Sequence, residues 1–341
     1  MGVSDEAPGE GVFQILSLSG GGYLGLYTAA VLAALEDHTK TPISRHFSLM
    51  AGTSIGGILA LALAADVEAK TIQQAFEDNG QEIFGNKPAP ESFLAVAADF
   101  CSRLLRSKYR AGALRNTIEG IVGADTRIGD LRHPVIVPAV NLSLGAPQVF
   151  KTPHHESLKL DLNLKVVDVA MATSAAPTFF PLARVGDSLY TDGGLFANSP
   201  DIISLHEATH FFGAPENQVR LLSVGTTTAK FSIASTRQPE FGIWQWARGA
   251  RLMTVTIASQ QQNVDSMLGH RLGDRYLRLD EQQSKEQEKL LGLDVATDEV
   301  RETVRALAAG TFQSAINDEL LNLILAHEAP EPTFFNLGNP A

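Results

Sequence analysis

The chain has 341 residues, of which 44% are hydrophobic and 19% are charged, a composition typical of a globular protein with a sizeable core. Its formal net charge of -11 argues against binding of polymeric nucleic acid, which relies on clustered Lys and Arg. A single cysteine, Cys101, excludes an intramolecular disulfide framework and a zinc site built on cysteines.

Neither a signal peptide nor a membrane-spanning segment is predicted. The start, MGVSDEAPGE, lacks the apolar core of a signal peptide, and the longest apolar run, Ile58–Ala65, is far too short to cross a bilayer. We therefore expect a cytoplasmic, soluble protein that meets lipid only at a membrane surface.

The first third of the chain alternates strands, glycine-rich turns and helices. After a flexible tail over 1–12, the pattern predicts a buried strand at 13–19 and a helix over 23–37. A second short strand at 47–51 and an apolar helix at 58–65 repeat this order. Such alternation is typical of an α/β fold.

The middle of the chain is mixed and its end is mostly helical. We expect helices within 70–120, at 166–175 and from 198 to about 212. Strands are expected at 134–141, 147–151 and 220–225, and a strand or hairpin at 184–191. From about 240 to 341 the pattern favours helices, one of them ending at Gly310. Without repeats or linker-like stretches, residues 13–341 are predicted to form one domain.

The first glycine-rich turn has the spacing of a dinucleotide-binding turn, Gly20-x-Gly22-x-x-Gly25. A dinucleotide site also needs a carboxylate about 20 residues further on, at the end of the second strand. Residues 45–52 read RHFSLMAG and contain none. A nucleotide-dependent oxidoreductase is therefore a weak alternative, and the loop can instead offer its N–H groups to another negative charge.

The second turn, Gly52-Thr53-Ser54-Ile55-Gly56, fits the nucleophile elbow G-x-S-x-G. A serine on a sharp strand-to-helix turn projects its Oγ out of the sheet, and the following helix favours negative charge there. Ser54 is thus a candidate nucleophile, and Gly20-Gly21-Gly22 could supply N–H groups for an oxyanion. The alternative is a serine that caps a helix on a glycine-rich turn.

The general base is the harder assignment. None of the nine histidines follows a strand in the order that a serine hydrolase requires, and His206 and His210, on one helix face, are interpreted as structural. Asp192 opens Asp-Gly-Gly after an apolar strand, so its carboxylate could take the proton of a nearby serine in a dry pocket. Taken alone, the same tripeptide also fits an ordinary β-turn.

Three motifs, in this order and spacing, resemble the patatin-like phospholipase family. They are Ser19–Gly25 (SGGGYLG), Gly52–Gly57 (GTSIGG), and Asp192–Gly194 followed by Asn198–Pro200, within a similarity that runs from 13 to 225. The resemblance implies a three-layer α/β fold with a mixed, mainly parallel central sheet flanked by helices and a helical C-terminal part. It also implies lipid acyl hydrolysis by a Ser–Asp dyad, with neither metal nor catalytic cofactor.

Carried onto this sequence, the family pattern makes Ser54 the nucleophile, Asp192 the general base, and the 20–22 glycines the oxyanion hole. The supporting motif glycines are Gly25, Gly52, Gly56, Gly193 and Gly194. The chain departs from the family at Leu24, where many members have arginine, and at Ser199, where many have a second asparagine. Neither departure touches the dyad.

Within the family, the opening FQILSLSGGGYLGLYTAAVL and the segment 149–155 (VFKTPHH) resemble the phospholipase effectors of bacterial CBASS anti-phage systems (the CapV type). That resemblance implies activation by a cyclic dinucleotide, typically 3′,3′-cyclic GMP-AMP (cGAMP), and attack on phospholipids at the inner face of the bacterial membrane. Two alternatives are a constitutive lipid acyl hydrolase and a non-catalytic cyclic-nucleotide sensor. The sequence leaves the activator site, the lipid preference and any homo-oligomer open.

A candidate membrane contact lies after the second helix. Apolar residues follow helical spacing at Phe93, Val96, Ala97, Phe100, Leu104 and Leu105, and basic residues cluster at Arg103, Arg106, Lys108, Arg110 and Arg115. A basic amphipathic helix suits an anionic membrane surface, and the same arginines could meet a nucleotide phosphate. The alternative is a helix packed on the core with a solvated basic edge.

Overall fold

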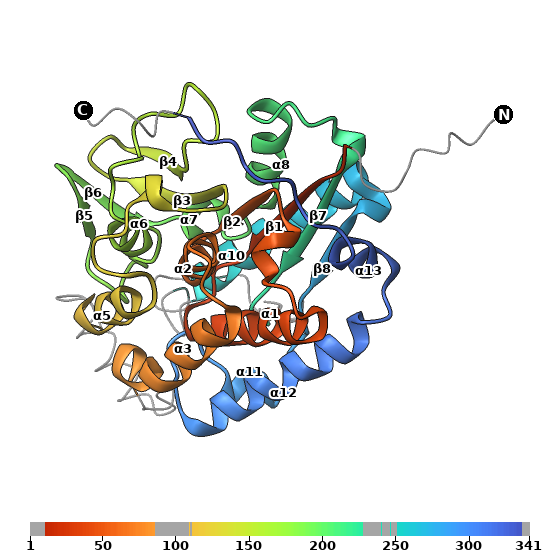
Figure 1. Ribbon diagram of the computed structural model, residues 1–341. Helices are drawn as coiled ribbons and strands as arrows, with labels where there is room; N and C mark the ends of the chain where they lie inside the picture. Colours follow the sequence, from red (N-terminus) through yellow and green to blue (C-terminus); the bar gives the residue numbers. More distant parts are fainter. Residues whose placement is uncertain are drawn as a thin grey trace, which may run out of the picture.

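A central eight-stranded sheet organises the protein (Figure 1). The computed structural model describes residues 11–85, 109, 111–227, 240, 246 and 251–335. The strands are β1 (Phe13–Leu18), β2 (Leu49–Gly52), β3 (Val135–Asn141), β4 (Ala146–Lys151), β5 (Ala183–Val185), β6 (Ser188–Asp192), β7 (Val219–Val224) and β8 (Tyr276–Leu279). Their order across the sheet is β5-β6-β3-β2-β1-β7-β8, and β4 pairs with β3 outside this path.

The sheet is mixed and mainly parallel. Strands β3, β2, β1, β7 and β8 run parallel to one another, whereas β4, β5 and β6 form antiparallel pairs at one side. The last residue of β1, Leu18, pairs with Gly52 of β2 and Val224 of β7. The carboxyl ends of three neighbouring strands therefore meet at one edge, where ligand and active sites of α/β folds form.

Helices cover both faces of the sheet. They are α1 (Gly25–Thr39), α2 (Ile55–Ala64), α3 (Ala69–Phe84), α5 (Ala111–Val122), α6 (Val166–Thr173), α7 (Gly194–Ala197), α8 (Asp201–His210), α10 (Arg251–Leu272), α11 (Gln287–Leu290), α12 (Asp298–Ala315) and α13 (Glu319–Leu325). Alternate residues of β1 face opposite layers: Leu16 joins the core shared with α1 and α2, and Ile15 packs with Leu205 of α8 and Leu268 of α10. Because both faces are covered, both polar residues of β1, Gln14 and Ser17, are buried along with most of its apolar ones.

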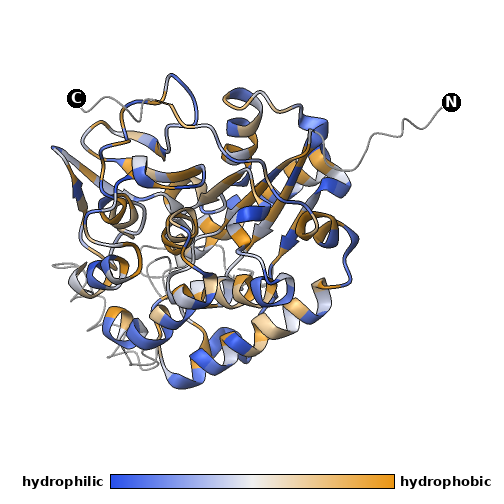
Figure 2. Ribbon diagram, viewed as in Figure 1, coloured by the Kyte–Doolittle hydropathy of each residue, from blue (hydrophilic) through white to orange (hydrophobic). Residues whose placement is uncertain are grey.

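Figure 2 shows how hydropathy follows these layers. The strands and α2 are largely hydrophobic, and all ten residues of α2 are buried. Helix α12 packs along α1 and is amphipathic, with Val300, Val304 and Ala308 buried and charged residues on the outer side. The predicted fold class, a three-layer α/β arrangement with a mixed, mainly parallel sheet, is confirmed.

The C-terminal part is mostly helical, as predicted, but one strand in it was not predicted and one expected helix end was wrong. Strand β8 lies in the region expected to be mostly helical. Its four residues (YLRL) are too few to show a strand periodicity, and their pairing with β7 decides their conformation. Gly310 does not end a helix: α12 continues to Ala315. An added Cβ at Gly310 would meet nothing, and Thr311 and Ala315 keep the buried stripe going beyond it.

Parts of the sequence prediction lie outside the described residues. These are most of the 1–12 tail, the apolar stripe at 93–105 and the basic residues up to Arg110. Arg115, in α5, makes ion pairs with Asp168 (2.7 Å) and Glu119 (3.6 Å), so it already has carboxylate partners. The division into a tail and one domain over 13–341 stays a prediction. In the part of the chain that the structure describes, no helix is long and apolar enough to cross a membrane.

Candidate active site

Ser54 occupies the tight turn between β2 and α2. Its backbone has φ 55° and ψ -126°, a conformation that non-glycine residues rarely adopt. The turn is held by two hydrogen bonds: the Ser54 N–H donates to Thr173 Oγ1 (2.9 Å), and Thr53 Oγ1 donates to the Ala197 carbonyl (2.6 Å). The strained turn places the side chain of Ser54 at the carboxyl edge of the sheet.

The glycines on either side of Ser54 allow the turn to close. A Cβ on Gly52 would lie 2.0 Å from the Gly56 carbonyl oxygen, and one on Gly56 would lie 2.3 Å from the Leu18 carbonyl oxygen. Both contacts are with backbone atoms, so no side chain can move aside. The structure therefore gives a steric reason for both glycines of the G-x-S-x-G pattern.

Asp192 meets Ser54 at the end of β6. Ser54 Oγ donates a hydrogen bond to Asp192 Oδ2 (2.7 Å), and the Gly194 N–H donates to Asp192 Oδ1 (2.7 Å). Gly193 has helical dihedrals and the short helix α7 begins at Gly194, so Asp-Gly-Gly is not a hairpin turn here. A Cβ on Gly193 would lie 2.3 Å from the Pro138 carbonyl oxygen, which explains a glycine at that position.

The Asp192 carboxylate is 5% exposed and is placed as a proton acceptor. Burial raises its pKa to about 6, and the hydrogen bonds from Gly194 and Ser54 oppose this rise by stabilising the charged form. Since a base works best when its pKa lies near the working pH, this shift makes a carboxylate better suited to accept a serine proton.

The glycine-rich loop lies beside Ser54. The Gly20 N–H donates to the Asn198 carbonyl (2.9 Å), and Asn198 Nδ2 donates back to the Gly20 carbonyl (3.2 Å). The N–H groups of Gly21 and Gly22 make no hydrogen bond to any residue within the described ranges. The predicted set of three donors is therefore reduced to two, because the Gly20 N–H is already used.

Two further glycines let the loop and the elbow approach each other. Gly22 has φ 57°, and a Cβ there would lie 2.1 Å from the Leu293 carbonyl oxygen. A Cβ on Gly25 would lie 2.2 Å from Ile55 Cγ1, directly after Ser54. The glycine spacing that resembles a dinucleotide fingerprint is thus used for close packing between the loop, the elbow and the C-terminal part.

A pocket of ≈ 710 Å³, its open mouth included, lies above Ser54. Its polar lining includes Ser54, Asp192, Asn198 and the backbone of Gly21 and Gly22, whose N–H groups have no hydrogen-bond partner among the described residues. Its walls are mostly apolar and include Ile55, Ile58, Phe84, Leu114, Phe179, Phe180, Leu195, Met253, Ile257 and Leu293. An apolar cavity with a few convergent polar groups is suited to an acyl chain with its ester at the floor.

Among the residues that the structure describes, no histidine lines this pocket. His206 and His210 lie exposed on α8 with stacked rings 5.2 Å apart, and His154 is buried against Glu207 (2.9 Å). Among the described residues, no group of three or more His, Cys, Asp or Glu could hold a metal ion. The pocket lining holds two hydroxyls, Ser54 and Ser174, and two carboxylates, Asp192 and Asp294. Ser54 and Asp192 are the pair joined by the 2.7 Å hydrogen bond.

Several residues that hold the site were not found from the sequence. Thr173 Oγ1 accepts from the Ser54 N–H and donates to the Pro138 carbonyl (2.6 Å), linking the elbow to β3. Gln260 of α10 accepts from the Asn198 N–H (3.1 Å) and donates to the Leu195 carbonyl (3.1 Å). The partners of Thr173 and Gln260 lie far along the chain, so no local pattern assigned them these roles.

Comparison with known proteins identifies the family. The model of the patatin-like phospholipase family (Patatin) matches residues 16–201, which contain all three motifs and more than half of the chain. The chain belongs to the patatin-like phospholipase family, whose members are hydrolases of ester bonds. This membership removes the oxidoreductase alternative.

Two curated bacterial relatives match most of the chain. One is the cGAMP-activated phospholipase of Pseudomonas aeruginosa (strain BWHPSA011 / Pa011), 40% identical over 330 residues, with 96% of each chain covered. Another is the cGAMP-activated phospholipase of Escherichia coli (strain TW11681), 35% identical, covering 93% of this chain and 94% of the relative. The crystal structure of VipD from Legionella pneumophila matches with a TM-score of 0.40 at 12% identity, covering 88% of this chain and 67% of that chain, too weakly to carry an argument.

Proposed function

We propose that this protein is a serine acyl hydrolase that cleaves phospholipid esters, with Ser54 as nucleophile and Asp192 as general base. The 2.7 Å hydrogen bond from Ser54 Oγ to Asp192 Oδ2, at the floor of an apolar pocket, carries the proposal. The intact pair of reactive groups also argues against a non-catalytic sensor, which would need neither a strained serine nor a buried base.

Acylation of Ser54 is the first half of the proposed reaction. As Ser54 Oγ attacks the ester carbonyl carbon, its proton passes to Asp192 Oδ2. The carbonyl oxygen becomes negative and is stabilised by the N–H groups of Gly21 and Gly22, helped by the N-terminal end of α2. When the intermediate collapses, the C–O ester bond breaks, and the leaving alcohol, a lysophospholipid, takes the proton from Asp192.

Deacylation repeats these roles with water. Asp192 takes a proton from a water molecule that attacks the acyl-Ser54 carbonyl, and the same two N–H groups stabilise the second oxyanion. The fatty acid leaves as Ser54 Oγ regains the proton from Asp192. One carboxylate thus acts as base and then acid in each half-reaction, which a pKa raised to about 6 favours.

The nucleophile can be tested directly. The substitution Ser54→Ala is expected to abolish fatty acid release from phospholipid vesicles, because it removes the attacking oxygen. The exposed Ser266 of α10 provides a matched control, and Ser266→Ala should behave as the unmodified protein. Substantial hydrolysis by a folded Ser54→Ala protein would refute the proposal.

Activation by a cyclic dinucleotide is a second part of the proposal. It is supported by the two bacterial relatives, which are named cGAMP-activated phospholipases and align with nearly the whole chain. The resemblance of the opening segment and of residues 149–155 to CBASS effectors adds a further part to the proposal: action on membrane phospholipids at the inner face of the bacterial membrane during anti-phage defence. The alternative is a constitutive lipid acyl hydrolase.

An assay of the purified protein on phospholipid vesicles, with and without 3′,3′-cGAMP, tests activation independently of hydrolysis. We expect fatty acid release to depend on the nucleotide and to be lost in Ser54→Ala with nucleotide present. Equal activity with and without a panel of cyclic dinucleotides would favour the constitutive enzyme and leave the assignment of Ser54 unaffected.

A further inference from the structure

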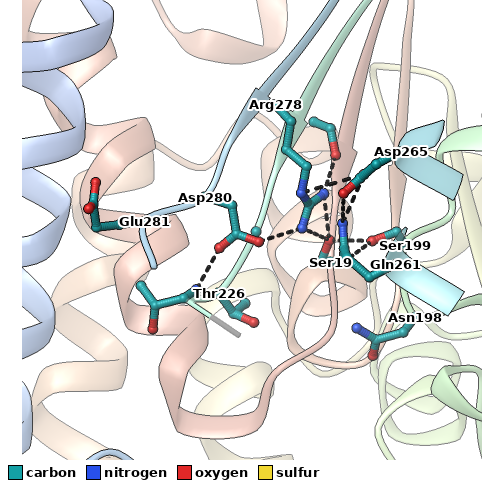
Figure 3. A network of polar contacts seen from close by, with 12 residues as sticks. Ser19, Asn198, Ser199, Thr226, Gln261, Asp265, Arg278, Asp280 and Glu281 are labelled. Atoms are coloured by element: carbon teal, nitrogen blue, oxygen red, sulfur yellow. Dashed lines mark hydrogen bonds and ion pairs between the residues drawn. The ribbon is translucent and has the colours of Figure 1, made fainter. Parts of the chain in front are cut away.

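A closed ring of polar side chains lies directly behind the glycine-rich loop (Figure 3). Arg278 of β8 donates from both Nη atoms to Ser19 Oγ (3.4 Å each), and Ser19 Oγ contacts Ser199 Oγ (2.8 Å). Ser199 Oγ donates to Gln261 Oε1 (2.7 Å), and Gln261 Nε2 donates to Asp265 Oδ1 (3.1 Å). The Asp265 carboxylate closes the ring with Arg278 Nε at 3.7 Å.

The direction of every hydrogen bond in this ring is fixed. Asp265 is an acceptor, so Gln261 turns its NH₂ toward that carboxylate and its oxygen toward Ser199. The Ser199 hydroxyl therefore donates its hydrogen bond to Gln261 and accepts one from the Ser19 hydroxyl. Ser19, in turn, accepts from the Arg278 guanidinium. Each serine hydroxyl donates one of these hydrogen bonds and accepts another, so a substitution at one position also removes a partner of its neighbours.

The ring contacts the two segments of the chain that fix the position of Gly20. Ser19 directly precedes Gly20, and Ser199 directly follows Asn198, which makes two hydrogen bonds with the Gly20 backbone. Both serines are almost fully buried, at 0% and 3% exposed. Because Gly21 and Gly22 follow at once, the orientation of their free N–H groups depends on where the ring fixes Ser19 and Asn198.

Arg278 is anchored on its other side. Its Nη1 donates to Ser223 Oγ (2.7 Å) and its Nη2 donates to Asp280 Oδ2 (2.7 Å), while Asp280 Oδ1 accepts from the Thr227 N–H (2.8 Å). These contacts tie the ends of β7 and β8 together. The guanidinium is thus held in place at the edge of the sheet, and Ser19 accepts its hydrogen bonds from a charged group whose position is fixed.

We propose that the ring of Ser19, Ser199, Gln261, Asp265 and Arg278 positions the oxyanion hole formed by Gly21 and Gly22. The inference rests on the proposed function of Ser54, and it makes Ser199, Gln261 and Arg278 positioning residues for the reaction. Ser199 stands where many family members have asparagine, so this chain holds its loop through a serine-to-glutamine link that joins the loop to α10.

The experiment compares an ester with its thionoester on variants of the ring, with 3′,3′-cGAMP present in every assay because activity is proposed to depend on it. Sulfur is a weaker hydrogen-bond acceptor than oxygen, so an ordered oxyanion hole accelerates p-nitrophenyl butyrate more than the corresponding thionobutyrate. Both Ser199→Ala and Gln261→Met are expected to lower kcat for the oxygen ester roughly 10- to 100-fold, with KM within about twofold. The thionoester rate should fall much less, so the ratio of the two rates falls.

Matched variants separate positioning from loss of fold. Ser204→Ala removes another buried hydroxyl, whose one hydrogen bond within the described residues is to the Asp201 carbonyl of its own helix, and both the kcat and the rate ratio should stay unchanged. Ser199→Thr keeps the hydroxyl and is expected to recover most of the rate ratio. Melting temperatures measured in parallel show that the variants compared are folded.

The outcomes distinguish this inference from the proposed function. Unchanged kcat in folded Ser199→Ala and Gln261→Met, or an equal loss on both esters, would overturn the positioning role while leaving Ser54 as nucleophile. Full activity of Ser54→Ala on the same esters would overturn the proposed function and the inference together. A selective loss on the oxygen ester, reversed in Ser199→Thr, supports both.

Discussion

Two carboxylates, the buried Asp192 and the partly buried Asp280, lie at the same edge of the sheet in different electrostatic settings. Burial raises the pKa of both. Asp280 lies 2.7 Å from the Arg278 guanidinium, which opposes this rise, whereas Asp192 receives only an N–H and a hydroxyl hydrogen bond and has no cationic partner among the described residues. The paired carboxylate holds the structure together, and the unpaired one keeps enough basicity to take a proton.

The same substitution at the two sites is expected to have opposite effects. Asp192→Asn should reduce phospholipid hydrolysis roughly 10³-fold or more, because the amide cannot accept the serine proton. It should also raise the free energy of unfolding by up to about 3 kcal/mol at neutral pH, since it removes a charge whose pKa burial raises to about 6.

Asp280→Asn should instead lower the free energy of unfolding by about 3 kcal/mol, because it leaves Arg278 without its shortest ion pair, and this loss outweighs the burial cost that raises the pKa of Asp280. Urea unfolding and vesicle hydrolysis measured on both variants check the comparison. Destabilisation by Asp192→Asn of the same size as by Asp280→Asn would contradict the distinction between the two sites.

Substituting Arg278 tests the same comparison by removing the cationic partner of Asp280. Arg278→Met should lower the free energy of unfolding by about 3–5 kcal/mol, because Asp280 and Asp265 lose a largely buried counter-charge. Arg278→Lys keeps the charge but not the planar fork, so its loss should be smaller. Equal stability of Arg278→Met and the unmodified protein in urea unfolding would show that the network contributes nothing net.

The pH dependence of hydrolysis should report on Asp192 alone. Its carboxylate must be ionised to take the serine proton, so the rate should fall about tenfold per pH unit below about pH 6. Stability moves the other way: because the folded-state pKa exceeds the ordinary value of 3.8, the contribution of Asp192 to the free energy of unfolding falls as pH rises from about 4 to 6. Initial rates on an uncharged soluble ester, with melting temperatures at each pH, test this, and a flat profile from pH 5 to 7 would contradict it.

The strained backbone of Ser54 gives the smallest expected effect. Glycine adopts φ 55° without the steric cost that a side chain brings, so Ser54→Gly should be more stable than Ser54→Ala by about 1–2 kcal/mol. Both variants lack the nucleophile and should be inactive, so the comparison isolates strain from chemistry. Chemical denaturation of the pair provides the measurement, and a less stable glycine variant would show that the turn is not strained.

Much of the site could be predicted from the sequence because its motifs are local. Gly52, Ser54 and Gly56 fall within five residues, and their spacing requires a tight strand-to-helix turn whatever surrounds it. The roles of Gly21 and Gly22, as against Gly20, could not be separated, since they depend on a hydrogen bond to Asn198, far along the chain.

The C-terminal part shows where local patterns fail. Strand β8 is four residues long and is defined by its neighbour β7, so its periodicity gave no warning that the region was not wholly helical. Arg278 and Gln261 looked like ordinary polar residues of a helical region. Their contacts with Ser19 and Ser199 span more than 60 residues of chain, and no propensity or spacing rule reaches that far.

The sequence by itself determined the α/β order of strands and helices, the glycine turns and the family to which the chain belongs, because these depend on short-range sterics and on motifs of fixed spacing. Only the tertiary structure brought Asp192 within 2.7 Å of Ser54, used the Gly20 N–H elsewhere, and closed the ring around Arg278. Those features arise where parallel strands end side by side. Which side chains meet there is decided by the pairing of strands that are distant in the chain, and not by the residues next to each side chain in the sequence.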